Sequence, residues 1–213
     1  MGRMKNALQG KSLVPVPVNP TGFNPSCKLP LGLKIDHIRL AMDDFISFLA
    51  VVNGALLGKG MPRLESILMA ANFSNTVGDF FISAVDRHCP TVAKNRYHNG
   101  HPDLIVRGKH PDDAVQYCDE GIEVKASRYV KSWQGHNAEN CWLMVVMFEG
   151  NGPRDEYLKI APMPFRFTGV VGAQLTKADW QFAGRSETSR RTITASVKDS
   201  GYQKMMANWI YRT

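Results

Sequence analysis

The sequence predicts an α/β or α+β fold in which a central mixed β-sheet is flanked by helices. Apolar residues recur at helical spacing through residues 36–89, and short apolar runs bounded by turn residues fill much of residues 101–197. A last amphipathic segment covers residues 201–212. Helices followed by strands and a closing helix are typical of a single domain of this class, and 213 residues are enough to give it a substantial core.

The first 33 residues are expected to form an extended arm. Five of the twelve prolines of the chain lie between Pro15 and Pro30. Proline has a fixed φ and lacks the main-chain N–H that a helix needs, so this stretch is not helical. Residues 34–213 then form the single domain.

Two helical segments are expected after the arm. Asp36 is a good N-cap for a helix through residues 37–58, which ends near Gly58 or Gly60. A second helical segment opens at Pro62, and its apolar stripe continues as far as His88. The polar stretch 72–76 is a place where this second segment could break in two.

The later part of the chain reads as strands with a final helix. The apolar run 141–149 is the kind expected of a central strand that is covered on both faces. The closing helix is expected over residues 201–212, with Ser200 as its cap. The other expected strands are 101–108, 122–127, 164–175 and 190–197, with a possible strand at 114–118.

Composition narrows the class of protein. Hydrophobic and charged contents of 44% and 21% are ordinary for a globular chain. No uninterrupted apolar run reaches the roughly 18 residues of a membrane span, so no membrane partner is expected. Phosphate-binding loops and dinucleotide-binding glycine patterns are absent, so no nucleotide cofactor is expected. The widely spaced cysteines, which form no CxxC, predict a reduced, intracellular protein. They are Cys27, Cys89, Cys118 and Cys141.

Positive charge gathers at the two ends of the chain. The formal net charge is +7; residues 1–40 hold six basic residues against one acidic, and residues 185–213 hold six against two. The middle of the chain is therefore slightly acidic. This distribution suits a polyanion held by the ends, with metal-binding carboxylates between them. Two solvated termini are the alternative.

Three ionisable residues form the most informative pattern. Asp103 opens one predicted strand, and Glu123 and Lys125, two apart on another, share a face of it. If the strands pair, the three side chains converge. Two neighbouring carboxylates repel each other unless a proton or a cation lies between them. Mg²⁺ accepts such oxygen ligands, and the Val124 carbonyl could supply another. Lys125 could then orient or deprotonate a metal-bound water, which supports phosphodiester hydrolysis.

The motif formed by these residues resembles that of a known enzyme superfamily. Pro102-Asp103, followed after nineteen residues by Glu123-Val124-Lys125, resembles the PD-(D/E)xK nucleases, whose best-known members are type II restriction endonucleases. The resemblance covers residues 60–150. It implies that Asp103 and Glu123 bind Mg²⁺, which Mn²⁺ can replace, and that Lys125 assists the attacking water. It also implies a restriction-endonuclease-like core and a cytoplasmic homodimer, of prokaryotic or viral origin, that acts on double-stranded DNA.

On this interpretation the domain has three parts. Residues 36–89 are helical, residues 94–150 form the catalytic core, and residues 151–213 supply strands, loops and a helix for DNA recognition. Some members of the superfamily carry a further acid on the helix that precedes the sheet. Glu65 is the natural candidate here, and Asp79 competes with it if one continuous helix runs through residues 62–88.

Candidate DNA contacts lie on both sides of the motif. Lys94 and Arg96 are close enough in sequence to reach a phosphate near the metal. His101 either lines the cleft beside Asp103 or simply precedes the strand. Two later groups could contact bases, through amides that read adenine and arginines that read guanine, although a polar turn and a surface hairpin are the alternatives. They are Gln134, His136 and Asn137, and Arg185, Arg190, Arg191 and Lys198.

The sequence thus favours a Mg²⁺-dependent, sequence-specific endonuclease of the type II restriction kind. A repair or recombination nuclease of the same fold, such as a resolvase or nickase, is the second hypothesis. The third is a DNA-binding protein without catalysis. For the motif itself, the alternative is a plain salt bridge between Glu123 and Lys125 on an exposed sheet face, with Pro102-Asp103 as ordinary turn chemistry.

Overall fold

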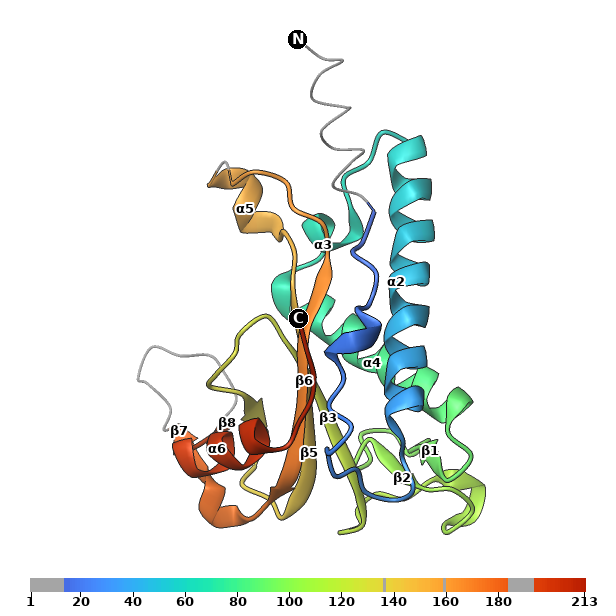
Figure 1. Cartoon of the computed structure of the whole chain (residues 1–213), viewed down its shortest axis with the longest axis vertical. Coiled ribbons are helices and arrows are strands. Elements are labelled where there is room, and N and C mark those ends of the chain that lie inside the picture. Colours follow the sequence, from blue (N-terminus) through green and yellow to red (C-terminus); the bar gives the residue numbers. More distant parts are fainter. Residues whose placement is uncertain (1–13, 136, 159, 184–193) are drawn as a thin grey trace.

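A six-stranded mixed sheet lies at the centre of the fold (Figure 1). The computed structural model describes residues 14–135, 137–158, 160–183 and 194–213. All neighbouring strands are antiparallel except β3 and β5, which are parallel. This architecture confirms the predicted mixed α/β class. In spatial order the strands are β1 (Val92–Lys94), β2 (Leu104–Val106), β3 (Gly121–Ser127), β5 (Cys141–Glu149), β6 (Arg166–Leu175) and β9 (Trp209–Arg212).

Helices cover one face of this sheet. The long helix α2 (Ile35–Gly58) packs against α4 (Ala70–His88), and both bury apolar side chains against the strands. Val124 and Met144 point into this layer, together with a cluster of phenylalanines. The shorter helices are α3 (Leu64–Ile67), α5 (Pro153–Tyr157) and α6 (Asp199–Ala207), and the 3₁₀ turns are η1 (Pro20–Gly22), η2 (Pro111–Asp113) and η3 (Lys177–Asp179).

A small antiparallel sheet and α6 cover the opposite face. The small sheet has the order β4 (Gln134–Gly135), β8 (Thr194–Val197) and β7 (Trp180–Ala183). A second apolar cluster joins it to the central sheet and includes Leu143, Val145 and Met205. Strand β5 is therefore buried from both sides, as its uninterrupted apolar run predicts.

The first helix begins earlier than expected. Lys34, and not Asp36, occupies the N-cap position. The His37 ring nitrogen Nδ1 accepts a hydrogen bond of 3.2 Å from the Lys34 main-chain N–H. Asp36 instead lies in the first turn, where the helix dipole favours a carboxylate. The helix ends at Gly58, as predicted.

The second helical segment breaks at a different place from the one expected. Leu68 and Met69 adopt extended ψ angles of 140° and 145°, so α3 and α4 are separate helices. The stretch 72–76 is helical and lies inside α4. Leu68, at the break, packs its side chain against the core cluster. No continuous helix runs from residue 62 to residue 88.

The possible strand at 114–118 makes only one isolated bridge, between Tyr117 and His101. The Asn95 side chain replaces a strand partner there: its Nδ2 donates to the Val115 carbonyl at 2.8 Å, and its Oδ1 accepts from the Val115 N–H at 3.1 Å. Since both main-chain groups are satisfied in this way, Val115 needs no strand.

The C-terminus also differs from the expectation. Helix α6 stops at Ala207, and Trp209–Arg212 forms β9 beside β6. Two consecutive residues, Ile210 and Tyr211, are almost completely buried on opposite sides of this strand. Lys198 is the N-cap of α6, while the Ser200 hydroxyl donates instead to Asp179 Oδ1 at 3.0 Å.

The described part of the arm, residues 14–33, lies along the domain (Figure 1). The Val16 N–H donates to the Phe165 carbonyl at 2.8 Å, and the Asn24 N–H donates to the Ile210 carbonyl at 3.0 Å. The first bond holds the arm beside the residue that precedes β6, and the second holds it against β9. The four cysteines are free thiols.

Helix α2 is the one helix in the described ranges that is long and apolar enough to cross a membrane by length and composition. Core helices pass the same test. Phe45 and Leu49 of α2 are fully buried against the sheet, so this helix is part of the core of the fold.

Candidate active site

The candidate site forms where β2 meets β3. The two strands pair antiparallel, with Leu104 opposite Ile122 and Ile105 opposite Gly121. This register brings Asp103, which directly precedes β2, beside the middle of β3. Asp103 Oδ2 accepts a hydrogen bond of 2.8 Å from the Val124 N–H. The convergence expected from strand pairing is therefore present.

The side chains of β3 alternate between two environments. Ile122 and Val124 point into the core beneath α4. Glu123 and Lys125 project together on the opposite face, into a cavity of about 540 Å³. The remaining lining comes from the loops that precede β2 and β5, from the end of β4 and from the first residues of β5 and β7: Asn99, Gly100, His101, Asp103, Gly135, Asn137, Glu139, Cys141 and Trp180.

Both oxygens of the Glu123 carboxylate have partners. Lys125 Nζ contacts Oε1, and His101 Nδ1 lies 3.0 Å from Oε2. The other ring nitrogen of His101, Nε2, lies 3.0 Å from Glu139 Oε2. The Glu123 and Lys125 side chains are only 13% and 29% exposed. A plain salt bridge on an exposed sheet face therefore does not describe this pair.

The two acids of the motif have opposite pKa shifts. Burial, and next the negative charge of Glu123, raise the pKa of Asp103 to about 7, although Lys125 and the Val124 N–H oppose the rise. Burial also raises the pKa of Glu123, but the hydrogen bond from His101 and the charge of Lys125 outweigh it and lower the pKa. Without added positive charge, the pair therefore favours a proton on Asp103.

The basic groups of the cluster respond to the same carboxylates. Burial lowers the pKa of Lys125, but Glu123 and then Asp103 raise it above its ordinary value. Burial likewise lowers the pKa of His101, and its bond to Glu123 leads the effects that raise it overall. Burial, and then Glu123 and Glu139, raise the pKa of the Cys141 thiol to about 12, so this thiol is protonated at neutral pH.

The oxygen donors of this cluster suit a hard cation. Asp103 and Glu123 supply two carboxylates. The Val124 carbonyl leaves β3 on the same side as its N–H, which faces Asp103. Mg²⁺ takes such oxygen ligands, often with only one or two carboxylates, and keeps water or phosphate oxygens in the other positions. Within the described ranges, no group of three or more His, Cys, Asp or Glu side chains could hold a metal ion; a cation held by these two carboxylates would take its other ligands from water or substrate.

Glu65 does not belong to this cluster. It is almost fully buried in α3, where its Oε2 accepts from Asn53 Nδ2 at 3.0 Å and its Oε1 lies 3.4 Å from Arg63 Nη1. It does not line the cavity. Asp79 is exposed on α4, which packs against the other face of β3. The structure therefore brings neither candidate for an accessory acid to the site.

The predicted DNA contacts have different positions. Asn137 lines the cavity, and Gln134 is exposed on β4. Lys94 lies on β1 with its Nζ 3.2 Å from Ser83 Oγ, and Arg96 is exposed just after β1. Lys198 Nζ donates to the Ala178 carbonyl at 3.2 Å. The predictions for His136, Arg185, Arg190 and Arg191 fall outside the described residues.

Sequence reasoning missed Glu139 and Trp180. Glu139 lies in the loop before β5, sixteen residues after Glu123, and only the folded chain brings it to His101. Trp180 reaches the cavity from the small sheet, and its indole N–H donates to the Glu139 carbonyl at 2.9 Å. The expectation that His101 lines the cleft is confirmed.

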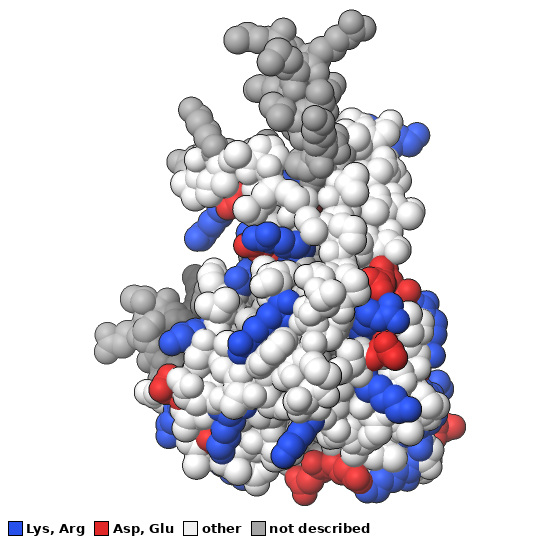
Figure 2. Space-filling model, in the orientation of Figure 1, with Lys and Arg blue, Asp and Glu red and all other residues white. Residues whose placement is uncertain are grey.

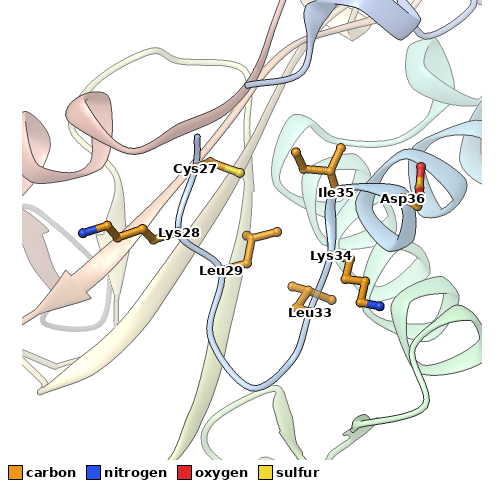
Figure 3. Close-up of a pocket in the computed structure, with 7 residues that line it drawn as sticks. All are labelled: Cys27, Lys28, Leu29, Leu33, Lys34, Ile35 and Asp36. Carbon is orange, nitrogen blue, oxygen red and sulfur yellow. The ribbon is translucent and has the colours of Figure 1, made fainter. Parts of the chain in front are cut away.

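A second hollow, of about 690 Å³, lies between the arm and the start of α2 (Figure 3). Cys27, Leu29 and Ile35 point into this space, while Lys28 and Asp36 point away from it. The three side chains that point into it carry no carboxylate and no basic group. The cluster at β2 and β3 is therefore the candidate active site.

Comparison of the chain with protein-family models, with curated proteins and with solved structures finds no match. The residues described above therefore carry the functional argument by themselves.

Proposed function

We propose that the chain is a Mg²⁺-dependent endonuclease that recognises a DNA sequence and cuts both strands, as type II restriction enzymes do. One observation carries the proposal: Asp103, Glu123 and Lys125 meet in one cavity, with Asp103 bonded to the main chain of Val124. This is the arrangement that the PD-(D/E)xK motif requires of its two strands.

Each residue has a role in the proposed reaction. Asp103, Glu123 and the Val124 carbonyl would hold Mg²⁺, or Mn²⁺ in its place. A cation bound there supplies Lewis-acid polarisation of the scissile phosphate and acidification of a bound water. Lys125 is protonated because the two carboxylates raise its pKa. Its ammonium group can orient the attacking water and neutralise charge that develops on the phosphate oxygens.

DNA would approach across the mouth of the cavity. Asn137 and Gln134 lie at this mouth and on the adjoining small sheet, where their amides can bond base edges. Lys94, Arg96 and Lys198 are proposed to hold phosphates. The net charge of +7 favours the approach of a polyanion.

A double-strand cut calls for two copies of the chain, because the described residues form one candidate site. An apolar surface supports such a homodimer. Figure 2 shows few charged side chains around the C-terminal half of α2. The exposed apolar side chains there and on the following segment are Val51, Leu57, Met61, Ile67 and Met69. An apolar surface with few charges can pair with itself across a two-fold axis.

Digestion of a fully sequenced plasmid with MgCl₂, followed by mapping of the ends, tests the function. The expected result is a small set of defined fragments from the wild type and none from Asp103→Ala or Lys125→Ala. If many DNA substrates stay uncut with both Mg²⁺ and Mn²⁺, the proposal that the chain is a nuclease is wrong. If Asp103→Ala cleaves DNA at the wild-type rate, the assignment of the active site to this cluster is wrong. Cutting of branched DNA alone, or of one strand alone, would instead indicate a repair or recombination nuclease.

A further inference from the structure

The imidazole of His101 lies between two carboxylates from different parts of the chain. Its Nδ1 is 3.0 Å from Glu123 Oε2, and its Nε2 is 3.0 Å from Glu139 Oε2. The three side chains are 19%, 13% and 23% exposed. The ring also stacks on Tyr117, with centroids 5.6 Å apart and planes inclined by 19°. A ring contacted at both nitrogens and on one face is held in a single orientation.

A residue of the small sheet holds the backbone of Glu139. The main-chain carbonyl of Glu139 accepts the indole N–H of Trp180 at 2.9 Å. Trp180 is almost fully buried and begins β7 of the small sheet. The small sheet therefore holds the backbone of Glu139, while the carboxylate of Glu139 holds His101.

The contacts of Glu123 show what His101 and Glu139 do at the site. Lys125 contacts Oε1 and His101 contacts Oε2, so these two side chains together set the direction in which the carboxylate faces. Lys125 is on the same strand as Glu123 and moves with it. His101 is the partner that ties Glu123 to a different segment.

We propose that His101 and Glu139 are positioning residues for the Glu123 carboxylate. Glu139 orients the His101 ring, and the ring holds Glu123 beside Asp103, ready to receive a cation. The inference rests on the proposed function, in which Glu123 is a metal ligand. Loss of a hydrogen-bonded partner that orients a metal ligand typically costs about 10- to 100-fold in metal affinity.

Removal of the His101 ring leaves its backbone in place. The His101 N–H donates to the Gln116 carbonyl, and its carbonyl accepts from the Cys118 N–H, each at 3.0 Å. His101→Ala therefore tests the ring itself. His98→Ala, on an exposed residue of the same loop, is the matched control. Glu120→Ala, on an exposed acid, is the control for Glu139→Ala.

Two measurements test the role. The first is the Mg²⁺ concentration for half-maximal plasmid cleavage, with KM for DNA measured in parallel. The second is Mn²⁺ affinity of the full chain without DNA, followed by electron paramagnetic resonance. We expect His101→Ala and Glu139→Ala each to weaken Mn²⁺ affinity and raise the Mg²⁺ midpoint about tenfold. KM for DNA should stay near the wild-type value, and both controls should match the wild type.

A double variant separates positioning from direct ligation. If Glu139 acts through His101, the variant with both alanines binds Mn²⁺ no more weakly than His101→Ala alone. Glu139→Gln, whose amide oxygen can still accept from Nε2, should recover part of the loss. A further full loss on adding Glu139→Ala to His101→Ala would make Glu139 a ligand itself and overturn the role.

Failure of this inference can be told from failure of the function. A wild type that cuts DNA and loses cutting with Asp103→Ala, but keeps its Mg²⁺ midpoint and Mn²⁺ affinity in His101→Ala, overturns the positioning role alone. A wild type that neither cuts DNA nor binds Mn²⁺ overturns the proposed function, and the inference with it.

Discussion

Asp103→Asn should make the metal-free protein more stable and at the same time inactive. The Asp103 carboxyl is held beside Glu123 in a half-buried cluster, and burial together with this neighbour raises its pKa to about 7. Ionised Asp103 therefore costs folding free energy at and above neutral pH. Asparagine keeps an oxygen that can accept the Val124 N–H and removes the charge, so the repulsion disappears while the hydrogen bond remains.

The size and the sign of the effect follow from linkage. A folded-state pKa of about 7, against an ordinary 3.8, corresponds to an upper limit of about 4 kcal/mol. The variant also loses the attraction between Asp103 and Lys125, which offsets part of this, so we expect a gain of about 1–3 kcal/mol near pH 8. Because the folded chain binds the extra proton between these two pKa values, wild-type stability falls as pH rises from about 4 to about 7.

Urea unfolding in EDTA, followed by tryptophan fluorescence from pH 5 to pH 8, measures both quantities. Asp112→Asn, at an exposed position, is the control and should leave stability unchanged. MgCl₂ should stabilise the wild type and not Asp103→Asn, because only a protein that binds the ion gains from it. If Asp103→Asn is less stable than the wild type near pH 8 without metal, Asp103 is a structural acid and the electrostatic reasoning fails.

Three further predictions concern other parts of the molecule. Lys125→Ala should lower the rate of DNA cleavage about 100-fold or more, while Lys109→Ala, at an exposed lysine, leaves the rate unchanged in the same plasmid assay. Asp179→Asn should cost about 2–3 kcal/mol in urea unfolding at pH 7, because this carboxylate is 4% exposed and accepts from Thr176, Ser200 and Lys204. The hydrogen bonds to Asp179 outweigh burial and lower its pKa. The stabilisation by this carboxylate is therefore present above its ordinary pKa of 3.8 and is lost as pH falls below that value. An unfolding free-energy difference between wild type and variant that is the same at pH 3 as at pH 7 would contradict this reasoning. Val51→Asp, on a residue that is 73% exposed, should shift the light-scattering mass from dimer to monomer without loss of folding, and a monomeric wild type would remove the proposed homodimer.

The sequence predicted the elements whose patterns are local. Strand β5 is apolar throughout because both of its faces are covered, and α2 and α4 repeat apolar residues at helical spacing. The missed strands β1 and β7 are three and four residues long. They exist because neighbouring strands offer main-chain partners, which no short window of sequence reveals.

The last strand shows the same limit more sharply. Residues 201–212 have an amphipathic pattern that suits a helix, and α6 does begin there. The chain turns at Asn208, whose side chain donates to the Gly172 carbonyl at 2.6 Å. Trp209–Arg212 can then pair with β6. Tertiary pairing thus overrides helical spacing in these four residues.

The candidate site likewise contains residues that local sequence patterns predict and residues that only the folded chain brings in. Asp103, Glu123 and Lys125 were found because strand geometry alone makes Glu123 and Lys125 neighbours and brings Asp103 near if the strands pair. Glu139 had no such signal, since it joins the cluster only through the fold of the loop before β5. Glu65 was chosen on helix position, and Asn53 and Arg63 hold it elsewhere.

The Glu123–Lys125 ion pair does not by itself distinguish a catalytic site from a structural one, because the structure contains the pair in either case. Asp103 makes the distinction. An ion pair needs no second carboxylate beside it, and the like charges of Glu123 and Asp103 oppose the ionisation of Asp103. The hydrogen bond from the Val124 N–H gives Asp103 a structural contact, but an uncharged oxygen could accept it equally well, whereas a cation between the two acids would remove the repulsion and use both charges. The metal-free stability of Asp103→Asn therefore tests the residue on which the two accounts differ.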